Sequence, residues 1–215
     1  MIGQLKNEMD RVLHIWKDRS LDQERKIFRT LGCDNKPLRD GRRSAVLMAR
    51  ILWAYSAAYE LVKRNEWKEL ADLAFADLYE HYRDRKNGGV YEMLDKDGKP
   101  LCRDKVIYTQ SYSIYACAQY YKISGNRISL EFAEDIFRRV EDSSWRNDLE
   151  GYLPLCGENW EPFENWNDRP ELKGKFVVDT FLHLIESYAV LYKVWKDPEL
   201  EQAVSAACRS PHRGS

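Results

Sequence analysis

The stretch DTFLHLIESYAVLYK at residues 179–193 combines an almost continuous apolar sequence with an aspartate, a histidine and a glutamate. At about 100° per residue in an α-helix, Asp179, His183 and Glu186 fall within one narrow stripe. The rest of the circumference carries Phe, Leu, Ile and Tyr side chains, which predicts a mostly buried helix. The polar stripe of a buried helix must face water or a reactive site. We therefore expect this helix to line a cavity.

Apolar residues recur at helical spacing through most of the 215 residues, which predicts an all-α protein. The breaks contain turn-forming residues, such as NGG at 87–89 and SGN at 124–126. In the segment GGVYEMLDKDGKPLC at 88–102, apolar and polar residues alternate around turn-forming residues. This pattern predicts a short β-hairpin between helices. We expect helices at residues 4–18, 43–64, 66–83, 104–122, 129–147 and 175–195, and another that starts at 198.

The expected helices pair into three hairpins, at 43–83, 104–147 and from 175 onward, and the first helix of each pair is the more apolar one. This pattern is typical of a toroid, in which apolar inner helices are surrounded by amphipathic outer helices. The helix that begins at Pro198 is too short to cover its partner. We therefore expect an exposed apolar edge along 43–64 and 175–195, with self-association through that edge as one consequence.

The charge pattern excludes several classes of partner. The chain has 34 Lys and Arg against 35 Asp and Glu, interleaved for a net charge of −1, so nothing predicts binding to nucleic acid or to an anionic membrane. The longest apolar run, AVLMARILWAYSAAY at 45–59, contains an arginine and is too short to span a bilayer. The five cysteines lie far apart without a CxxC pair. We therefore expect a cytoplasmic protein with reduced thiols.

Arg50 lies inside that apolar run and has apolar neighbours on both sides. A guanidinium group stays charged and is rarely buried without a partner, so Arg50 must face a carboxylate, a ligand or water. Two interpretations are open. Arg50 either forms a buried ion pair with an acidic residue such as Asp179 or Glu186, or faces a ligand, since charges in apolar surroundings gather at functional sites.

Tyr108, Tyr112 and Tyr115 recur at helical spacing in the helix expected at 104–122. A stripe of phenol rings more often packs in a core than binds a ligand, and only Tyr108, at the start of the helix, is expected in a site. His183 and Glu186 are three residues apart, so one can orient the other; a structural role and an acid–base role are both open. No second histidine stands at ligand spacing, so no metal site is predicted.

Three segments together resemble the N-acylglucosamine 2-epimerase superfamily, most closely its cellobiose 2-epimerase branch. They are ARILWAYSAAY (49–59), GGVYEMLDKDGKPLCRDKVIYTQSYSIYACAQYYKISGN (88–126) and FLHLIESYAVLYKVWKDP (181–198). The resemblance covers residues 1–205 as the N-terminal half of an (α/α)6 barrel and leaves 206–215 as an irregular tail. It implies inner helices that line a pocket for a monosaccharide or disaccharide, with no metal or nucleotide cofactor.

The resemblance also implies an isomerase that removes the C2 proton of a reducing-end sugar and returns it to the other face of C2, or to C1, through an enediolate. Such chemistry needs hydrogen-bond donors at the enediolate oxygens and acid–base groups on two faces. By position, the resemblance assigns the catalytic roles to Arg50, His183 and Glu186, and sugar contacts to Trp53, Tyr108 and Asp179. Asp179 stands where this branch usually has an asparagine, and the later half of the family, with two further histidines, has no counterpart here.

Two functions of different classes follow. The first is a sugar 2-epimerase or isomerase, completed by another chain. The second is a catalytically inactive, truncated helical remnant that binds sugar or a protein partner. A toroidal glycoside hydrolase is a third and weaker reading, because hydrolysis needs two opposed carboxylates and Asp179 and Glu186 share one helix.

Overall fold

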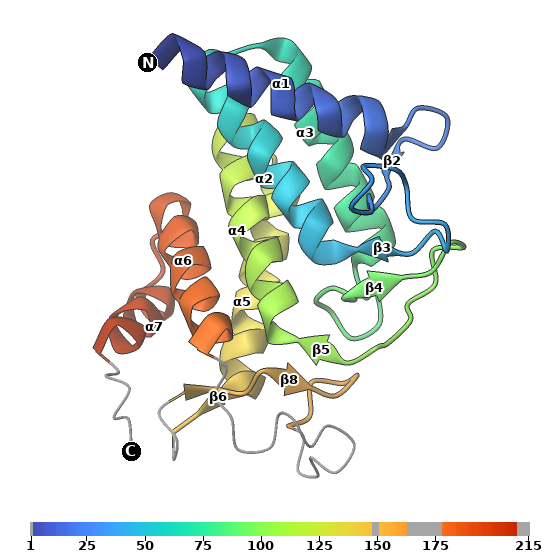
Figure 1. The fold of residues 1–215 in the computed structure, drawn as a ribbon. Coiled ribbons are helices and arrows are strands. Elements are labelled where there is room, and N and C mark those ends of the chain that lie inside the picture. Colours follow the sequence, from blue (N-terminus) through green and yellow to red (C-terminus); the bar gives the residue numbers. More distant parts are fainter. Residues whose placement is uncertain (1, 148–150, 163–177, 210–215) are drawn as a thin grey trace.

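The computed structural model describes residues 2–147, 151–162 and 178–209, and these are mainly helical (Figure 1). The seven α-helices of the described residues confirm the all-α class and lie close to the expected ranges. The third is extended by one turn of π-helix, η1 (Leu78–Tyr82). The helices are α1 (Ile2–Ser20), α2 (Ala45–Val62), α3 (Asn65–Asp77), α4 (Ile107–Ser124), α5 (Arg127–Ser144), α6 (Val178–Val194) and α7 (Pro198–Arg209).

The helices form an arc of two layers, as half of a ring would. In the inner layer α4 packs between α2 and α6 (Figure 1). In the outer layer α3 packs along α2, α5 along α4 and α7 along α6, so each helical hairpin expected from the sequence is present. α1 lies across the start of the arc and makes few contacts with α2.

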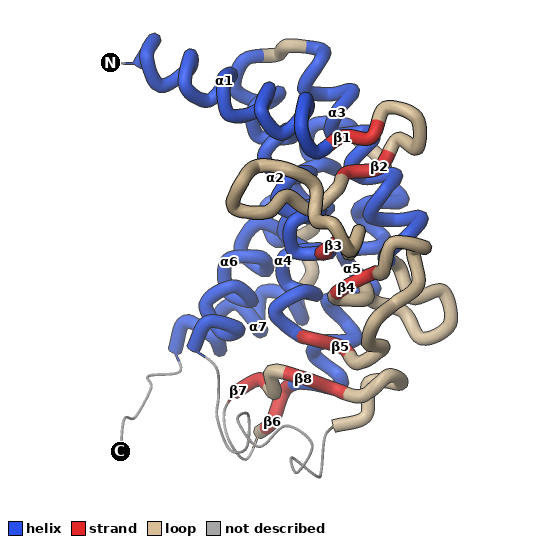
Figure 2. Tube along the Cα trace, turned by 45° about the vertical axis from the view of Figure 1, so that its right-hand side comes forward, coloured by secondary structure: helices blue, strands red, loops and turns tan. Residues whose placement is uncertain are grey.

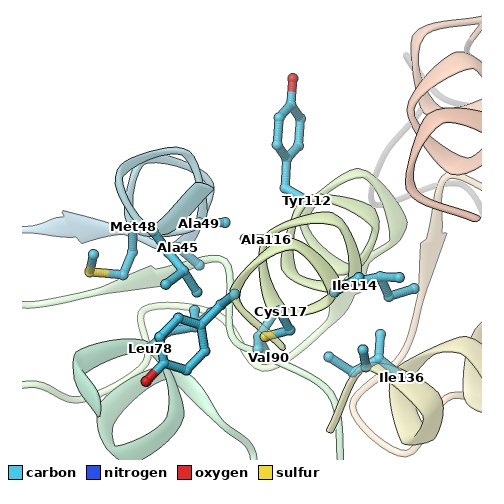
Figure 3. Close-up of a cluster of buried hydrophobic side chains, with 14 of the residues drawn as sticks. Ala45, Met48, Ala49, Leu78, Val90, Tyr112, Ile114, Ala116, Cys117 and Ile136 are labelled. Atoms are coloured by element: carbon cyan, nitrogen blue, oxygen red, sulfur yellow. The ribbon is translucent and has the colours of Figure 1, made fainter. Parts of the chain in front are cut away.

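The core lies between the two layers and explains why the inner helices are so apolar. α2 is the one helix of the described residues that is long and apolar enough to cross a membrane, a composition that a core helix shares. Met48 and Leu52 of α2 are buried against this core, as is Trp67 of α3. Figure 3 shows part of the cluster, with Ile114 and Cys117 of α4 pointing into it. Each fully buried large apolar side chain stabilises the fold by about 1.5–3 kcal/mol.

Local sequence sets the ends of several helices. The Ser44 side chain accepts a hydrogen bond from the Leu47 amide at the start of α2. α4 ends at Gly125, whose φ of 69° is a left-handed conformation that glycine adopts without strain. Asn126 follows directly and its side chain accepts bonds from two amides at the start of α5. The sequence SGN at 124–126 therefore ends one helix and starts the next.

Short antiparallel strands connect outer to inner helices and follow one side of the molecule (Figure 2). The predicted hairpin at 88–102 is only partly correct. A single bridge between Leu94 and Pro100 closes its turn, but the strand just before that turn, Met93–Leu94, pairs with a strand that precedes α2. The pairs are β1 (Leu21–Asp22) with β2 (Ile27–Phe28), β3 (Arg43–Ser44) with β4 (Met93–Leu94), β5 (Lys105–Val106) with β8 (Leu155–Cys156), and β6 (Trp145–Arg146) with β7 (Gly151–Tyr152).

These connections contain a turn that occurs three times. Each turn lies between two residues that are joined by a single β-bridge. The fourth residue after the first bridged residue has a left-handed backbone conformation in all three turns: Asn35 (φ 57°), Gly98 (φ 80°) and Trp160 (φ 69°). The strand β3 leads directly into the inner helix α2, and β5 leads directly into the inner helix α4 in the same way. The chain is therefore built from a repeated unit of outer helix, connection and inner helix.

Two buried ion pairs fix the strands that lead into the inner helices. Arg43 of β3 lies 2.8 Å from Asp77, and Lys105 of β5 lies 2.5 Å from Asp84; the Lys105 and Asp84 side chains are both 0% exposed. Burial alone would raise the pKa of Asp84, but hydrogen bonds from Lys105 and two backbone amides hold it at about 2. Burial lowers the pKa of Lys105 despite the same partner. Both pairs thus hold charge inside the fold through complete pairing.

The C-terminal boundary differs slightly from expectation. α7 continues to Arg209, past the boundary expected at residue 205. Residues 210–215, including His212, and 163–177, including Trp166, lie outside the described residues.

Candidate active site

The polar side chains of the concave wall occupy equivalent positions on the three inner helices. α2, α4 and α6 begin at residues 45, 107 and 178, so Arg50, Tyr112 and His183 are each the sixth residue of their helix. The second residues are Val46, Tyr108 and Asp179, and the ninth are Trp53, Tyr115 and Glu186. Three such layers, about one helical turn apart, form the wall near the N-terminal ends of the inner helices.

The middle layer is a continuous hydrogen-bonded chain. The Arg50 Nη2 donates to the Tyr112 hydroxyl at 2.6 Å, and that hydroxyl lies 3.3 Å from Nε2 of His183. The guanidinium carbon also lies 4.7 Å from the centre of the Tyr112 ring. The hydrogen bond from Arg50 to Tyr112 raises the pKa of Arg50. The wall thus presents a permanent cation beside a phenol and an imidazole.

The two carboxylates of the polar stripe flank His183. Nδ1 of His183 lies 3.2 Å from a Glu186 oxygen, and Nε2 lies 3.4 Å from an Asp179 oxygen. The Asp179 and Glu186 side chains are 65% and 53% exposed, while that of His183 is 24% exposed. A histidine that is oriented by a carboxylate and reached by solvent is suited to proton transfer.

Aromatic rings surround this layer on both sides. The Tyr108 ring meets the His183 ring edge to face at 5.0 Å, and burial with the neighbouring Tyr112 raises the pKa of Tyr108 to about 12. One layer further along the helices, Trp53 stacks on Tyr115 at 5.3 Å, and burial with the nearby Glu186 raises the pKa of Tyr115 to about 12. These phenols therefore stay neutral at pH 7 and can donate hydrogen bonds.

The structure decides between the two interpretations of Arg50. Its bonded partner is Tyr112, while Asp179 and Glu186 lie against His183 instead. Arg50 is exposed rather than buried, since the side of α2 that carries it faces the open wall. The buried ion pair with Asp179 or Glu186 is therefore wrong, and Arg50 faces open space as the second interpretation requires.

Tyr112 is the residue that sequence reasoning missed. Phenols at helical spacing predicted core packing, and Tyr112 is indeed only 8% exposed. Figure 3 nevertheless shows its side chain pointing away from the buried cluster that contains Ile114 and Cys117. The signal that identifies it is the repeat, because Tyr112 holds the position of Arg50 and His183 in the neighbouring helices.

The wall gathers groups that are suited to acid–base chemistry. Within the described ranges, no group of three His, Cys, Asp or Glu side chains is placed to hold a metal ion. Together the cation, the neutral phenols and the carboxylate-flanked histidine define a helical half-ring whose inner face is equipped for proton transfer on a small polar molecule.

Comparison with known proteins identifies the family. A profile of the N-acylglucosamine 2-epimerase (GlcNAc 2-epimerase) family matches residues 27–174. Cellobiose 2-epimerase of Bacteroides fragilis is 35% identical over 206 residues, which cover 92% of this chain and 52% of that protein. Cellobiose 2-epimerase of Dictyoglomus turgidum is 27% identical and covers 91% of this chain and 50% of its own length. The chain therefore belongs to the N-acylglucosamine 2-epimerase family.

A solved structure of a cellobiose 2-epimerase has the same fold over the matched part. The cellobiose 2-epimerase from Bacillus thermoamylovorans B4167 superposes with a TM-score of 0.85 at 26% identity, over 95% of this chain and 54% of that one. The arc of helices is accordingly part of an (α/α)6 barrel. The chain spans about half the length of the curated relatives that it matches.

Proposed function

We propose that this chain forms one wall of a sugar epimerase that acts at C2 of a reducing-end sugar, in the manner of a cellobiose 2-epimerase. The observation that carries the proposal is the chain of contacts from Arg50 through Tyr112 to His183, at 2.6 and 3.3 Å. A cation and a proton-transfer group in one layer match the two demands of enediolate chemistry, charge stabilisation and movement of the C2 proton. The curated relatives named as cellobiose 2-epimerases support the same reaction.

Each side chain has a role in this proposal. Arg50 binds the oxygens on which negative charge develops, and Tyr112 holds its guanidinium in place and donates a hydrogen bond of its own. His183 transfers the proton on this side of the sugar, with Glu186 orienting the imidazole. Tyr108 and Trp53 contact the sugar faces, and Asp179 accepts hydrogen bonds from sugar hydroxyls.

Hydrogen exchange at C2 tests this reaction directly. We expect the chain, alone or co-expressed with the C-terminal half of the Bacteroides fragilis cellobiose 2-epimerase, to incorporate deuterium at C2 of cellobiose in D₂O, detected by NMR and mass spectrometry. Arg50→Ala should slow the exchange by about 10²–10³-fold, and His183→Ala should abolish it. Leu101→Lys is the control, because Leu101 is 57% exposed and lies outside the site. Absence of exchange in both forms of the protein would refute the proposal.

The second step of the reaction separates epimerisation from isomerisation. Return of the proton to the other face of C2 gives a mannose-ended disaccharide, whereas return to C1 gives a ketose. A base on the opposite wall favours the first outcome, because the two faces of C2 are then served by different groups. Chromatography of the products distinguishes the two.

The second candidate is a helical unit that binds sugar or a protein partner without turnover. Its support is that His183 is the one histidine on the concave wall among the described residues, since His14 lies against Trp67 and His81 against Asp77 in the outer layer. Binding of cellobiose by calorimetry without any C2 exchange would establish this function in place of the first.

A further inference from the structure

A small cavity lies on the side of the molecule that carries the strands β1 to β4 (Figure 2). It is bordered by the β1–β2 hairpin, by the segment that leads into β3 and by the turn after β4, and none of its residues belongs to the concave wall. Its volume of about 100 Å³ is that of about three molecules of liquid water. Pockets for drug-sized ligands begin at about 300 Å³, so this cavity suits a small ion or a single polar group.

The charged side chains around the cavity are nearly all basic. Among the described residues that line it, they are Asp22, Arg25, Arg29, Arg42, Arg43 and Lys96. The carboxylate of Asp22 accepts hydrogen bonds from two backbone amides of its own turn at 3.1 Å. Arg43 is already paired with the buried Asp77. Four cations therefore remain around a space with one carboxylate, and like charges at close range repel one another unless an anion lies between them.

Two of these four cations have weakly bound partners. Arg42 lies 2.9 Å from Asp40, and Lys96 lies 3.6 Å from Asp97. The side chains of both pairs are more than half exposed. Exposed ion pairs contribute little to stability, so either cation can turn to a ligand at small cost.

The Arg29 side chain has no hydrogen-bond or ion-pair partner in the part of the chain that the structure describes. Arg29 follows β2, where Phe28 is 2% exposed and packs in the core, so Ile27 and Arg29 point to the opposite side and line the cavity. The Nε atom of Arg29 is buried. A guanidinium group stays charged and is costly to bury unpaired, which favours an anion beside Arg29.

Thr30 and Gly41 complete the cavity. The Thr30 hydroxyl oxygen accepts a hydrogen bond from the Ser44 amide at 3.2 Å, which leaves its own O–H free to donate. Gly41 has a φ of 69°, and a Cβ at this position would lie 2.7 Å from the Cβ of Lys96. Glycine allows this close approach, so Lys96 comes from the turn after β4 to lie beside the arginines.

We propose that this cavity binds a tetrahedral oxyanion, namely inorganic phosphate or the phosphate group of a small phosphomonoester, between Arg29, Thr30 and Lys96. The planar guanidinium group matches the geometry of phosphate oxygens, and the lysine and the hydroxyl add separate donors. Arg25 and Arg42 are exposed and add positive charge at the rim. The anion joins the β1–β2 hairpin, the segment that leads into α2 and the turn after β4. The proposal does not depend on the sugar reaction, because it concerns binding alone.

Calorimetric titration of the full chain tests the site with two probes, inorganic phosphate and glycerol 3-phosphate, at an ionic strength held constant with sodium chloride. We expect saturable binding of phosphate and a higher midpoint of thermal unfolding in its presence, since a ligand that binds the folded state stabilises it. Binding of both probes assigns the site to a phosphate group, and binding of inorganic phosphate alone assigns it to the free ion.

Single variants locate the binding. Arg29→Gln and Lys96→Gln should each weaken phosphate binding at least tenfold, because each removes a hydrogen bond to a charged group. Arg29→Lys should retain part of the affinity, since it keeps the charge but loses the planar fork of donors. Arg127→Gln is the matched control, because it removes the same charge from a side chain that is 65% exposed on α5, outside the cavity.

Lys96→Gln keeps the test decisive if Arg29→Gln fails to fold, because the Lys96 side chain is 73% exposed. Circular dichroism checks that each variant keeps its helical content. The absence of saturable binding to the wild-type chain would overturn the proposal. Binding that Lys96→Gln and the folded Arg29 variants weaken no more than Arg127→Gln does would overturn it as well.

Discussion

Two sets of charged residues lie near the N-terminal ends of the inner helices, and they differ in how completely they are paired. Arg43 and Lys105 precede α2 and α4, are buried, and meet carboxylates at 2.8 and 2.5 Å. Arg50 and His183 lie within the helices and face open space, and the two carboxylates beside His183 are 3.2 and 3.4 Å away and more than half exposed.

The difference separates charge that holds the fold from charge that is free to meet a ligand. A buried ion with every partner in place is costly to disturb and has nothing left to offer a ligand. An exposed cation, and a partly exposed imidazole with loose carboxylate contacts, can exchange their present contacts for a substrate at small cost. Burial and pairing, rather than the presence of charge in an apolar segment, distinguish the two sets.

The largest effect is expected from breaking a buried pair. Lys105→Met should lower the free energy of unfolding by about 3–5 kcal/mol, because it leaves the buried Asp84 carboxylate without its cation. Urea denaturation measures this. The double variant Lys105→Met, Asp84→Asn should recover most of the loss, since no unpaired charge remains. Equal losses in the single and double variants would show that the lysine acts through packing alone.

On the open wall, removal of a charge should change activity and spare stability. Arg50→Ala should slow C2 exchange by about 10²–10³-fold, the usual effect of losing one group that stabilises a developing oxyanion. The free energy of unfolding should fall by less than about 1 kcal/mol. Arg50→Lys should retain part of the activity, because it keeps the charge but loses the planar fork of donors. Unchanged exchange with a large loss of stability would reverse the assignment.

Acid should weaken the buried set through Asp84. Its pKa is held at about 2 in the folded protein, below the ordinary value of 3.8, so the unfolded chain binds more protons between these values. Stability is therefore lost as pH falls through this window, by about 2 kcal/mol from this group. Denaturation curves at pH 5, 4, 3 and 2 should show a smaller acid-induced loss in Asp84→Asn than in the wild type.

The smallest effect is expected for an exposed carboxylate of the wall. Glu186→Gln should change the free energy of unfolding by less than about 0.5 kcal/mol, because exposed ion pairs contribute little. Thermal unfolding at pH 7 measures this. A loss above about 1.5 kcal/mol would place the His183–Glu186 contact among the structural pairs.

Most of the helical architecture could be predicted from the sequence, because helix periodicity and turn residues are local signals. The strand pairing could not, since β3 and β4 are separated by an entire helical hairpin and consist of two residues each. The buried cations were also missed. Arg43 and Lys105 stand in the polar segments GRRS and RDKV, and only tertiary contacts with Asp77 and Asp84 bury them.

For the candidate site, the sequence indicated which residues share one wall but not their contacts. Arg50, His183 and Glu186 lie on one wall together with Trp53, Tyr108 and Asp179, which could be expected from helix faces. That Tyr112 joins Arg50 to His183 depends on the alignment of three neighbouring helices, and no single helix contains that information.

The third repeated turn joins two of the repeated units. Trp160 occupies a left-handed position that Asn35 and Gly98 fill in the other turns, where a β-branched or bulky residue is uncommon. Its indole donates to the Asn87 carbonyl at 2.9 Å, which lies 73 positions earlier in the sequence. Trp160 therefore couples the third connection to the second, so that each of the two units contributes to the stability of the other.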